Sequence, residues 1–235
     1  MSEAVRTFTL ASAILLALAS ARCVSQSPGV EVELVFEAPP SYDALTSPVT
    51  RSEAFIIEVA LVPCEEPTYT FWQALSTPVA HAHEGESTPT GWAGARRVNA
   101  LSVAGDPIAL LSPPATEYCA VVVTFAPDEV SEADPREDPM VGRSVGVEGE
   151  FLSSEGSTRS FAVRASAHQT EVIPLDTRLV LDDAQDIARV ALSFDALAWA
   201  DSMEFEGVNP GVAAAALSDG LHTHLHAEVT MLIDE

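Results

Sequence analysis

The sequence predicts an all-β protein, an antiparallel β-sandwich of about eight to ten strands with one short helix near its carboxyl terminus. Short apolar runs recur at near-regular spacing along the 235 residues, and several alternate apolar with polar residues at period two, as a half-buried strand does. The 16 prolines and 12 glycines separate these runs, which is typical of a turn-rich β protein. The 47% apolar composition is sufficient for a large buried core.

Residues 1–21 are expected to be a signal peptide. The apolar run within this segment is too short for a comfortable membrane span of ~20 residues. It ends in Ala19 and Ala21, which satisfy the small-x-small pattern that precedes a cleavage site. The sequence therefore predicts export, with residues 22–29 as a spacer and residues 30–235 as a single β-sandwich domain.

Cys23 lies just after the expected cleavage site and leaves two outcomes open. Lipidation of Cys23 would anchor the protein to a membrane, whereas simple secretion would leave the cysteine in a flexible amino terminus. Arg22 favours secretion, because a bacterial lipoprotein signal places a small residue directly before the lipidated cysteine. The expected location is the periplasm or cell envelope, and a lipid anchor is the only expected route to membrane contact.

The first half of the domain is expected to contain five strands. Residues 30–36 alternate apolar and acidic side chains, which predicts a strand with one face in the core. Residues 54–62 are nearly continuous in apolar side chains, as in a central strand buried on both faces. Residues 68–75 are aromatic and β-branched and predict a short strand. Two further short strands are expected at residues 97–103 and 107–111, around a turn.

The second half is expected to be a buried strand followed by two hairpins. Residues 119–125 are nearly continuous in apolar side chains and predict a second buried strand. Residues 145–152 and 160–175 are predicted to pair through a turn rich in serine and glycine. Residues 178–181 and 187–194 are predicted to pair through an acidic turn.

Two short helical segments are expected near the carboxyl terminus. Residues 195–201 predict one helical turn around Trp199. Residues 210–218 are the best helix candidate, because Pro210 suits a first helical turn and the four consecutive alanines lose least on helix formation. A last strand is expected to run to about Ile233.

Acidic residues dominate the charge of the chain. It contains 35 acidic residues and 11 basic ones, all of them arginine, for a formal net charge of −24. Nucleic acid and anionic membranes are therefore poor partners. The acidity has two interpretations, solubility in a secreted or salt-exposed setting and attraction of cations to the surface, and charge alone does not choose between them.

His81 and His83 lie two residues apart in a loop-like run, residues 78–92, between two cysteine-bearing strands. On an extended segment this spacing points both imidazoles to the same side, within reach of one metal ion. Glu84 or Glu86 could add an oxygen ligand. The alternative is an exposed polar loop that merely contains two histidines.

Three more histidines, His222, His224 and His226, alternate with other residues near the carboxyl terminus. On a strand all three imidazoles would share one face, whereas on a continued helix only His222 and His226 would. Either arrangement brings two imidazoles together as a further contribution to a metal site. Imidazole ligands suit copper and zinc, and the alternative is a solvated protein surface. His168 stands alone and predicts an ordinary surface histidine.

No pattern in the sequence predicts an enzyme. Residues 142–146, Gly-Arg-Ser-Val-Gly, fit the nucleophile-elbow pattern, but they lead into an expected strand, whereas that motif needs a helix after the serine. The chain has no His-Glu-x-x-His motif, no phosphate loop and no dinucleotide fingerprint. A binding function is therefore expected.

Cys64 and Cys119 are predicted to form a disulfide. One lies at the end of an expected core strand and the other near the start of a second, in a protein that is expected to reach an oxidising compartment. The bond would hold the base of the histidine-bearing loop. The alternative is two buried free thiols, since free cysteine is among the most buried residue types.

The order of these features resembles a known family. It runs from an export signal through Val62-Pro63-Cys64, Trp72, the histidine pair, Tyr118-Cys119, Leu179-Val-Leu-Asp182 and Ser193-Phe-Asp195 to Trp199. This layout resembles the bacterial periplasmic copper-binding proteins related to the methanobactin-associated MbnP group. The resemblance implies a β-sandwich that holds copper through histidines. It also implies, as in some members, a partner dihaem oxidase that converts a tryptophan to kynurenine, and here Trp92 or Trp72 would be that residue.

Together these features predict an exported metal-binding protein, not an enzyme, that binds or handles copper in the periplasm. His81 and His83 are the expected first ligands, and the carboxy-terminal histidines are a further contribution. Copper, as Cu(I) or Cu(II), is the expected metal, and zinc is the alternative. The competing class is a metal-free envelope or surface β-sandwich that binds a polysaccharide or another protein.

Overall fold

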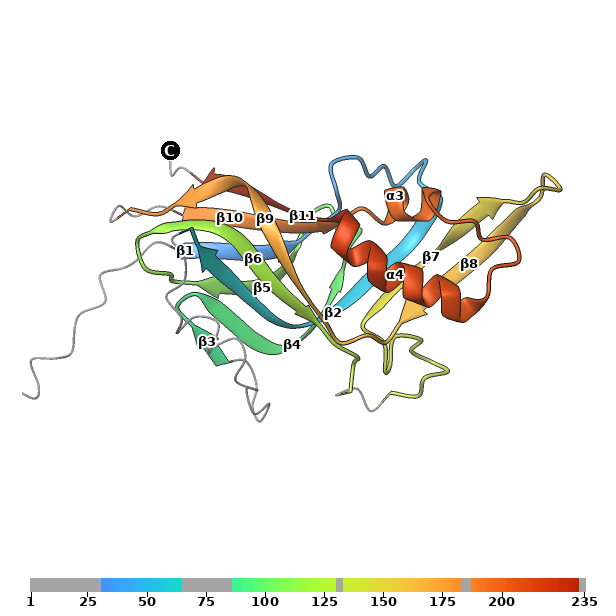
Figure 1. The fold of residues 1–235 in the computed structure, drawn as a ribbon, viewed down its shortest axis with the longest axis horizontal. Coiled ribbons are helices and arrows are strands. Elements are labelled where there is room, and N and C mark those ends of the chain that lie inside the picture. The colour runs from blue at the N-terminus through green and yellow to red at the C-terminus, as the bar shows by residue number, and fades with distance from the viewer. Residues whose placement is uncertain (1–30, 65–85, 130–132, 183–186, 233–235) are drawn as a thin grey trace, which may run out of the picture.

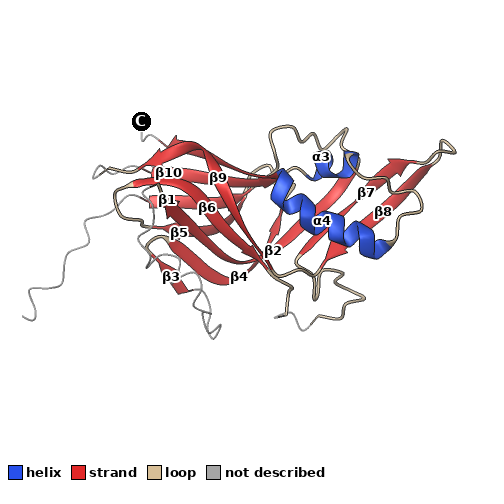
Figure 2. Cartoon of the chain, in the orientation of Figure 1, coloured by secondary structure: helices blue, strands red, loops and turns tan. Residues whose placement is uncertain are grey.

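The structure, a computed structural model, describes residues 31–64, 86–129, 133–182 and 187–232. Strands make up 53% of it and helices 12%, so the predicted all-β class is confirmed (Figure 2). The strands are β1 (Glu31–Phe36), β2 (Val49–Pro63), β3 (Glu86–Thr88), β4 (Gly91–Asn99), β5 (Asp106–Leu111), β6 (Glu117–Phe125), β7 (Val145–Leu152), β8 (Thr158–Ala165), β9 (Gln169–Val180), β10 (Ile187–Phe194) and β11 (Leu225–Leu232). The helices are α3 (Ala196–Asp201) and α4 (Pro210–His224).

All the described strands belong to one sheet. Its main path runs in the order β3-β4-β2-β6-β9-β11-β10-β1-β5, and β7 and β8 extend it from β2. The sheet curls into a half-barrel (Figure 1). β4, the second strand of this path, approaches β5, the last one, and the Arg96 guanidinium on β4 donates a hydrogen bond to the Pro107 carbonyl on β5.

This mixed, curled sheet differs from the predicted antiparallel sandwich. β1 runs parallel to β10, and β9 runs parallel to β11. A period-two pattern reports which face of a strand is buried, and it does not report which strand lies beside it. A curled sheet and a pair of stacked sheets therefore produce the same alternation in sequence.

One predicted hairpin is confirmed and the other is wrong. β7 pairs antiparallel with β8, with Val145 opposite Ala165. The predicted strand 160–175 is interrupted at residues 166–168, and the chain then continues as β9 to Val180. The predicted pairing of residues 178–181 with 187–194 does not form, because β11 lies between β9 and β10 in the sheet.

The long strand β2 connects the two ends of the molecule. Its amino-terminal part, from Val49 to Ala54, pairs with β7, and its later part pairs with β6. The β7–β8 hairpin with α3 and α4 therefore forms one end of an elongated molecule, and the curled sheet forms the other (Figure 1).

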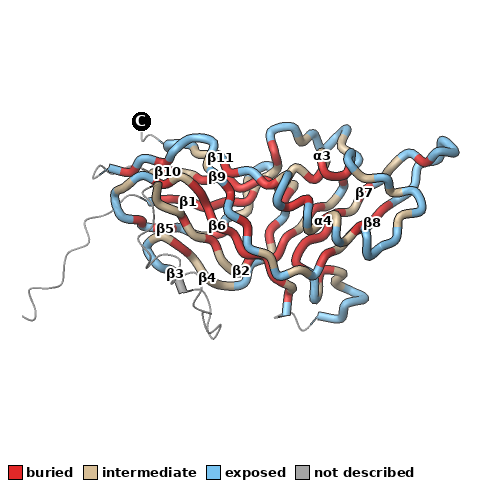
Figure 3. The backbone as a smooth tube through the Cα atoms, viewed as in Figure 1, coloured by how far each residue is buried: buried red, intermediate tan, exposed pale blue. Residues whose placement is uncertain are grey.

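Buried apolar side chains form one cluster that runs through both ends (Figure 3). β6 is buried on both faces, as predicted, since Val121, Val122 and Val123 are each at most 2% exposed. β2 is buried on both faces only around Phe55 and Ile56, and beyond them its side chains alternate in burial. The core strands of the sheet are thus the two most apolar runs of the sequence.

Both predicted helical segments are present. α3 begins after Asp195, whose carboxylate accepts a hydrogen bond from the Ala198 amide at 2.8 Å, and it contains Trp199 as predicted. α4 begins after Asn209, whose side chain accepts from the Gly211 amide at 2.8 Å, with a proline in its first turn. No helix in the described part of the chain is both long and apolar enough to span a membrane.

α4 ends at His224, later than the predicted end at residue 218. Its added turns bury Leu221 and bring Gly220 against the Trp199 indole. A Cβ atom at Gly220 would lie 2.4 Å from Cδ1 of Trp199, so only glycine allows this approach. Packing against Trp199 therefore explains why α4 continues beyond residue 218, which helix propensity alone does not predict.

Arg97 on β4 joins the sheet to the loop that contains Asp138. Its Nη2 lies 2.9 Å from Glu53 Oε2, and its Nη1 lies 2.6 Å from Asp138 Oδ2. The hydrogen bond from Arg97 lowers the pKa of Asp138. A carboxylate with a depressed folded-state pKa stabilises the fold above its unfolded pKa of about 4, and this contribution is lost as the pH falls through the folded-state value.

Asp138→Asn is therefore expected to lower the free energy of unfolding by about 0.5–1 kcal/mol at neutral pH, a small loss because the ion pair is partly exposed. The difference from the wild type should shrink toward zero as the pH falls below about 4. Urea unfolding of both proteins at a series of pH values measures it. A difference that stays constant with pH would show that the charge of Asp138 is not the cause.

Candidate metal site

Several predicted site residues lie outside the described residues. These are His81, His83, Trp72 and Cys23. The structure does, however, describe the residues on either side of segment 65–85, which carries the two histidines.

The amino-terminal end of this segment is fixed by the predicted disulfide, which is confirmed. Cys64 directly follows β2 and is bonded to Cys119 on β6, with an S–S distance of 2.00 Å and a Cα–Cα distance of 4.8 Å. The Cys64 amide also donates to the Glu117 carbonyl at 2.8 Å. The chain therefore leaves the sheet from a residue that is tied to two strands.

The carboxyl-terminal end of the segment is fixed by strand pairing. β3 pairs antiparallel with β4, with Glu86 opposite Ala93 and Ser87 opposite Trp92. His83 precedes Glu86 by only three residues, and three residues span at most about 11 Å. The structure thus places Trp92 beside the point where the histidine-bearing segment rejoins the sheet.

Trp92 lies on a strand, although residues 78–92 were predicted to be loop-like. Its half-buried indole packs against the core. The indole also lies over Gly94, where a Cβ atom would be 2.5 Å from Cζ2 of the ring. The Arg96 guanidinium lies 5.9 Å from the ring centroid, a cation–π distance. These contacts fix the orientation of the indole on β4, opposite Ser87 on β3.

The carboxy-terminal histidines lie across a change of secondary structure. α4 ends at His224 and β11 begins at Leu225, so His222 and His224 are helical and His226 is on a strand. The chain therefore follows the helical pattern up to His224 and the strand pattern from Leu225 onward. Leu221 is buried by helical spacing and Ala227 by strand alternation. The three imidazoles do not form the single row that a continuous strand would give.

His222 is held by a carboxylate that sequence reasoning missed. Its Nδ1 lies 2.8 Å from Oε2 of Glu171 on β9. The Glu171 side chain is 10% exposed, whereas the His222 side chain is 78% exposed. Gln169 also donates to Glu171, at 2.5 Å, and to the Ser218 carbonyl, at 3.0 Å. The period-two spacing of Gln169 and Glu171 was the available signal, but the sequence did not show that α4 would pack beside them.

The structure also describes Ser144 and His168, two other residues discussed from the sequence. Ser144 is buried, its hydroxyl donates to the Ala165 carbonyl at 3.2 Å, and the next residue begins a strand, as predicted. His168 is exposed in the connection between β8 and β9.

Within the described ranges, no group of three or more His, Cys, Asp or Glu side chains is placed to hold a metal ion. The predicted first ligands fall outside those ranges, so the metal site stays a prediction. Comparisons of the chain with protein-family models, with curated proteins and with solved structures find no match.

Proposed function

We propose that this is an exported, non-enzymatic protein that binds copper, or zinc as the alternative, through His81 and His83. The observation that carries the proposal is the anchoring of segment 65–85 at both ends. Cys64 is tied to β6 by a disulfide, and Glu86 is tied to β4 by strand pairing. Fixing both ends of a loop reduces the conformational entropy lost when its side chains converge on an ion.

The charge and the cysteines support the same proposal. A net charge of −24 raises the local concentration of cations at the surface. The disulfide fits an oxidising compartment, which agrees with export. Imidazole is a ligand that copper and zinc accept well, whereas calcium prefers oxygen. A site with two histidines should therefore select a transition metal from among the cations that the acidic surface attracts.

His222 is the strongest candidate for a further ligand among the carboxy-terminal histidines. A histidine that ligates a metal commonly donates its other ring N–H to a carboxylate. Glu171 is 2.8 Å from Nδ1 of His222, which directs Nε2 of this largely exposed ring away from the carboxylate. The arrangement suits a ligating Nε2, and His224 and His226 on the same connection would supplement it.

Titration of the purified mature protein with Cu(I), Cu(II) and Zn(II), followed by removal of unbound metal and metal analysis, tests the proposal. Copper is expected to remain bound in stoichiometric amount. Excess calcium in a parallel titration is the control, because it competes for carboxylates but not for imidazoles. Copper that is displaced by calcium, or absent after removal of unbound metal, would leave the metal-free envelope protein as the better account.

A further inference from the structure

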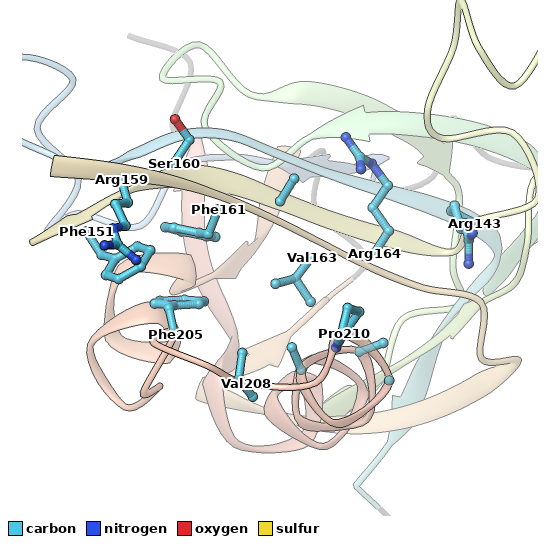
Figure 4. Close-up of a pocket in the computed structure, with 14 residues that line it drawn as sticks. Arg143, Phe151, Arg159, Ser160, Phe161, Val163, Arg164, Phe205, Val208 and Pro210 are labelled. Atoms are coloured by element: carbon cyan, nitrogen blue, oxygen red, sulfur yellow. The ribbon is translucent and has the colours of Figure 1, made fainter. Parts of the chain in front are cut away.

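A groove of about 650 Å³ lies between β8 and the amino-terminal part of α4 (Figure 4). Six consecutive residues of β8, from Arg159 to Arg164, line it. Successive side chains of a strand point to opposite faces of the sheet. Since consecutive residues of β8 line the groove, side chains from both faces of the sheet contribute to it. The groove therefore runs along the edge of β8 and not across one face.

The edge of β8 that borders the groove has no strand partner among the described residues, because β8 pairs only with β7. The Ser153 amide donates to the Ser157 carbonyl at 2.9 Å, and Glu150 donates away from β8, to the Pro48 carbonyl, at 2.8 Å. Along an antiparallel strand, successive residues direct their backbone N–H and C=O groups alternately toward one neighbouring strand and toward the opposite side. In this register Ser160, Ala162 and Arg164 direct theirs away from β7. They form a template for one more strand.

The charged side chains that line the groove are all basic, although the protein is strongly acidic. Three arginines and no acidic residue line it, although the chain has 35 acidic residues and only 11 arginines. Arg159 lies at the start of β8. Arg143 lies at the other end, where its Nη1 donates to Oγ of Ser166 at 2.9 Å (Figure 4). The third, Arg164, is paired with Glu148.

The two end arginines are available to an anionic partner. Arg159 forms an exposed ion pair with Glu155, which contributes little to stability, and it also lies near enough to Glu206 to help lower the pKa of that carboxyl. Arg143 forms no ion pair with any described residue, and its guanidinium uses one of its five N–H groups to donate to the uncharged hydroxyl of Ser166. An acidic group at either end would therefore gain a charge-assisted hydrogen bond without breaking a strong one.

The middle of the groove is apolar. Phe161 and Val163 point from β8 toward α4, and the Phe161 ring stacks on Phe205 with 4.1 Å between centroids. Val208 and Ala213 also line this part. From one end of β8 to the other, the groove thus presents a cation, two apolar positions and a second cation.

We propose that the free edge of β8 binds an extended segment of a partner protein, which adds to the sheet as a strand. The complementary segment carries an acidic residue at each end and apolar residues at the two positions between them, spaced at period two. A second copy of this chain is a poor occupant, because β8 carries two arginines and no acidic residue to pair with them. This site is separate from the proposed metal site.

The probe is the synthetic peptide acetyl-Glu-Thr-Val-Thr-Val-Thr-Glu-amide with a fluorescent label, measured by fluorescence anisotropy with the full chain. The peptide reads the same in both directions, so the test does not depend on strand orientation. It is expected to bind about tenfold or more tightly than the same peptide with lysine in place of glutamate. Two further peptides carry N-methyl groups, one on the three threonine amides and the other on the two valine amides. Only one of these two sets of amides can face β8, so one of the two peptides should fail to bind and the other should still bind.

Two variants of the protein test the same edge. Arg143→Glu with Arg159→Glu should abolish binding of the glutamate peptide and favour the lysine peptide. Ala162→Pro should block strand addition while it leaves the pairing with β7, because the Ala162 amide points outward. Arg178→Glu, on β9, is the control for reversing the charge of one arginine outside the groove, and it should leave binding unchanged. Circular dichroism confirms that each variant is folded.

Three results would overturn the proposal. The first is no binding of either peptide. The second is equal binding of both N-methylated forms and of the parent, which would indicate a contact without strand addition. The third is a dimer of the free protein that the Arg143→Glu, Arg159→Glu variant dissociates, which would make a second copy the occupant of the edge.

Discussion

Trp199→Ala is expected to lower the free energy of unfolding by about 3–5 kcal/mol. Trp199 is 1% exposed, and its indole N–H donates to the Ala216 carbonyl of α4 at 3.2 Å. Phe205 meets the ring edge-on, with 6.0 Å between centroids, and Gly220 allows α4 to lie directly against it. Truncation would leave a cavity between the two helices, so the helical end of the molecule should lose its packing first.

Chemical denaturation followed by circular dichroism measures this loss, and Val212→Ala is the matched control. Val212 lies on α4 but is 60% exposed, so its truncation should change the free energy of unfolding by less than about 0.5 kcal/mol. Gly220→Ala supplies a second test of the same contact, because the added methyl group would clash with the indole and should also destabilise the protein. Equal effects of Trp199→Ala and Val212→Ala would contradict the central packing role of Trp199.

Removal of the disulfide, by Cys64→Ser with Cys119→Ser, is expected to lower the free energy of unfolding by about 4 kcal/mol in the chain-entropy model. The bond joins residues separated by 55 in sequence, so it strongly restricts the unfolded chain. This loss is large beside a typical net stability of ~5–15 kcal/mol. Denaturant unfolding of the oxidised wild type and the double variant measures it.

Reduction of the wild type should reproduce the loss, whereas Cys23→Ser should leave stability unchanged, because Cys23 is outside the disulfide. Non-reducing peptide mapping provides an independent check and should recover Cys64 and Cys119 in one linked pair of peptides. Separately alkylated thiols at both positions in oxidised protein would refute the pairing.

The sequence predicted buried strands well and their neighbours poorly. Burial on both faces of β6 followed from its apolar run, and the predicted strand 54–62 ends one residue before β2 does. The position of β11 between β9 and β10 could not be predicted, because it depends on contacts between distant parts of the chain. The same limit explains why the curled mixed sheet was expected to be a sandwich.

At the candidate site, too, local features could be predicted from the sequence and contacts between distant segments could not. The Cys64–Cys119 disulfide could be inferred because each cysteine lies near the end of a predicted strand and the protein is expected to reach an oxidising compartment. The structure confirms the bond. Glu171 could not be assigned as the partner of His222, because the contact exists only where α4 crosses β9. The groove along β8 could not be predicted either, because it forms only where the start of α4 lies beside β8.

The most direct test of the metal-binding proposal compares copper affinity in three proteins by competition with a chelator of known affinity. The wild type is expected to bind copper tightly, and His81→Ala with His83→Ala should lose this binding. The triple variant His222→Ala, His224→Ala, His226→Ala should retain it with at most a weakened affinity. Tight binding that survives the loss of His81 and His83, or a wild type that takes no copper from the chelator, would contradict the proposal.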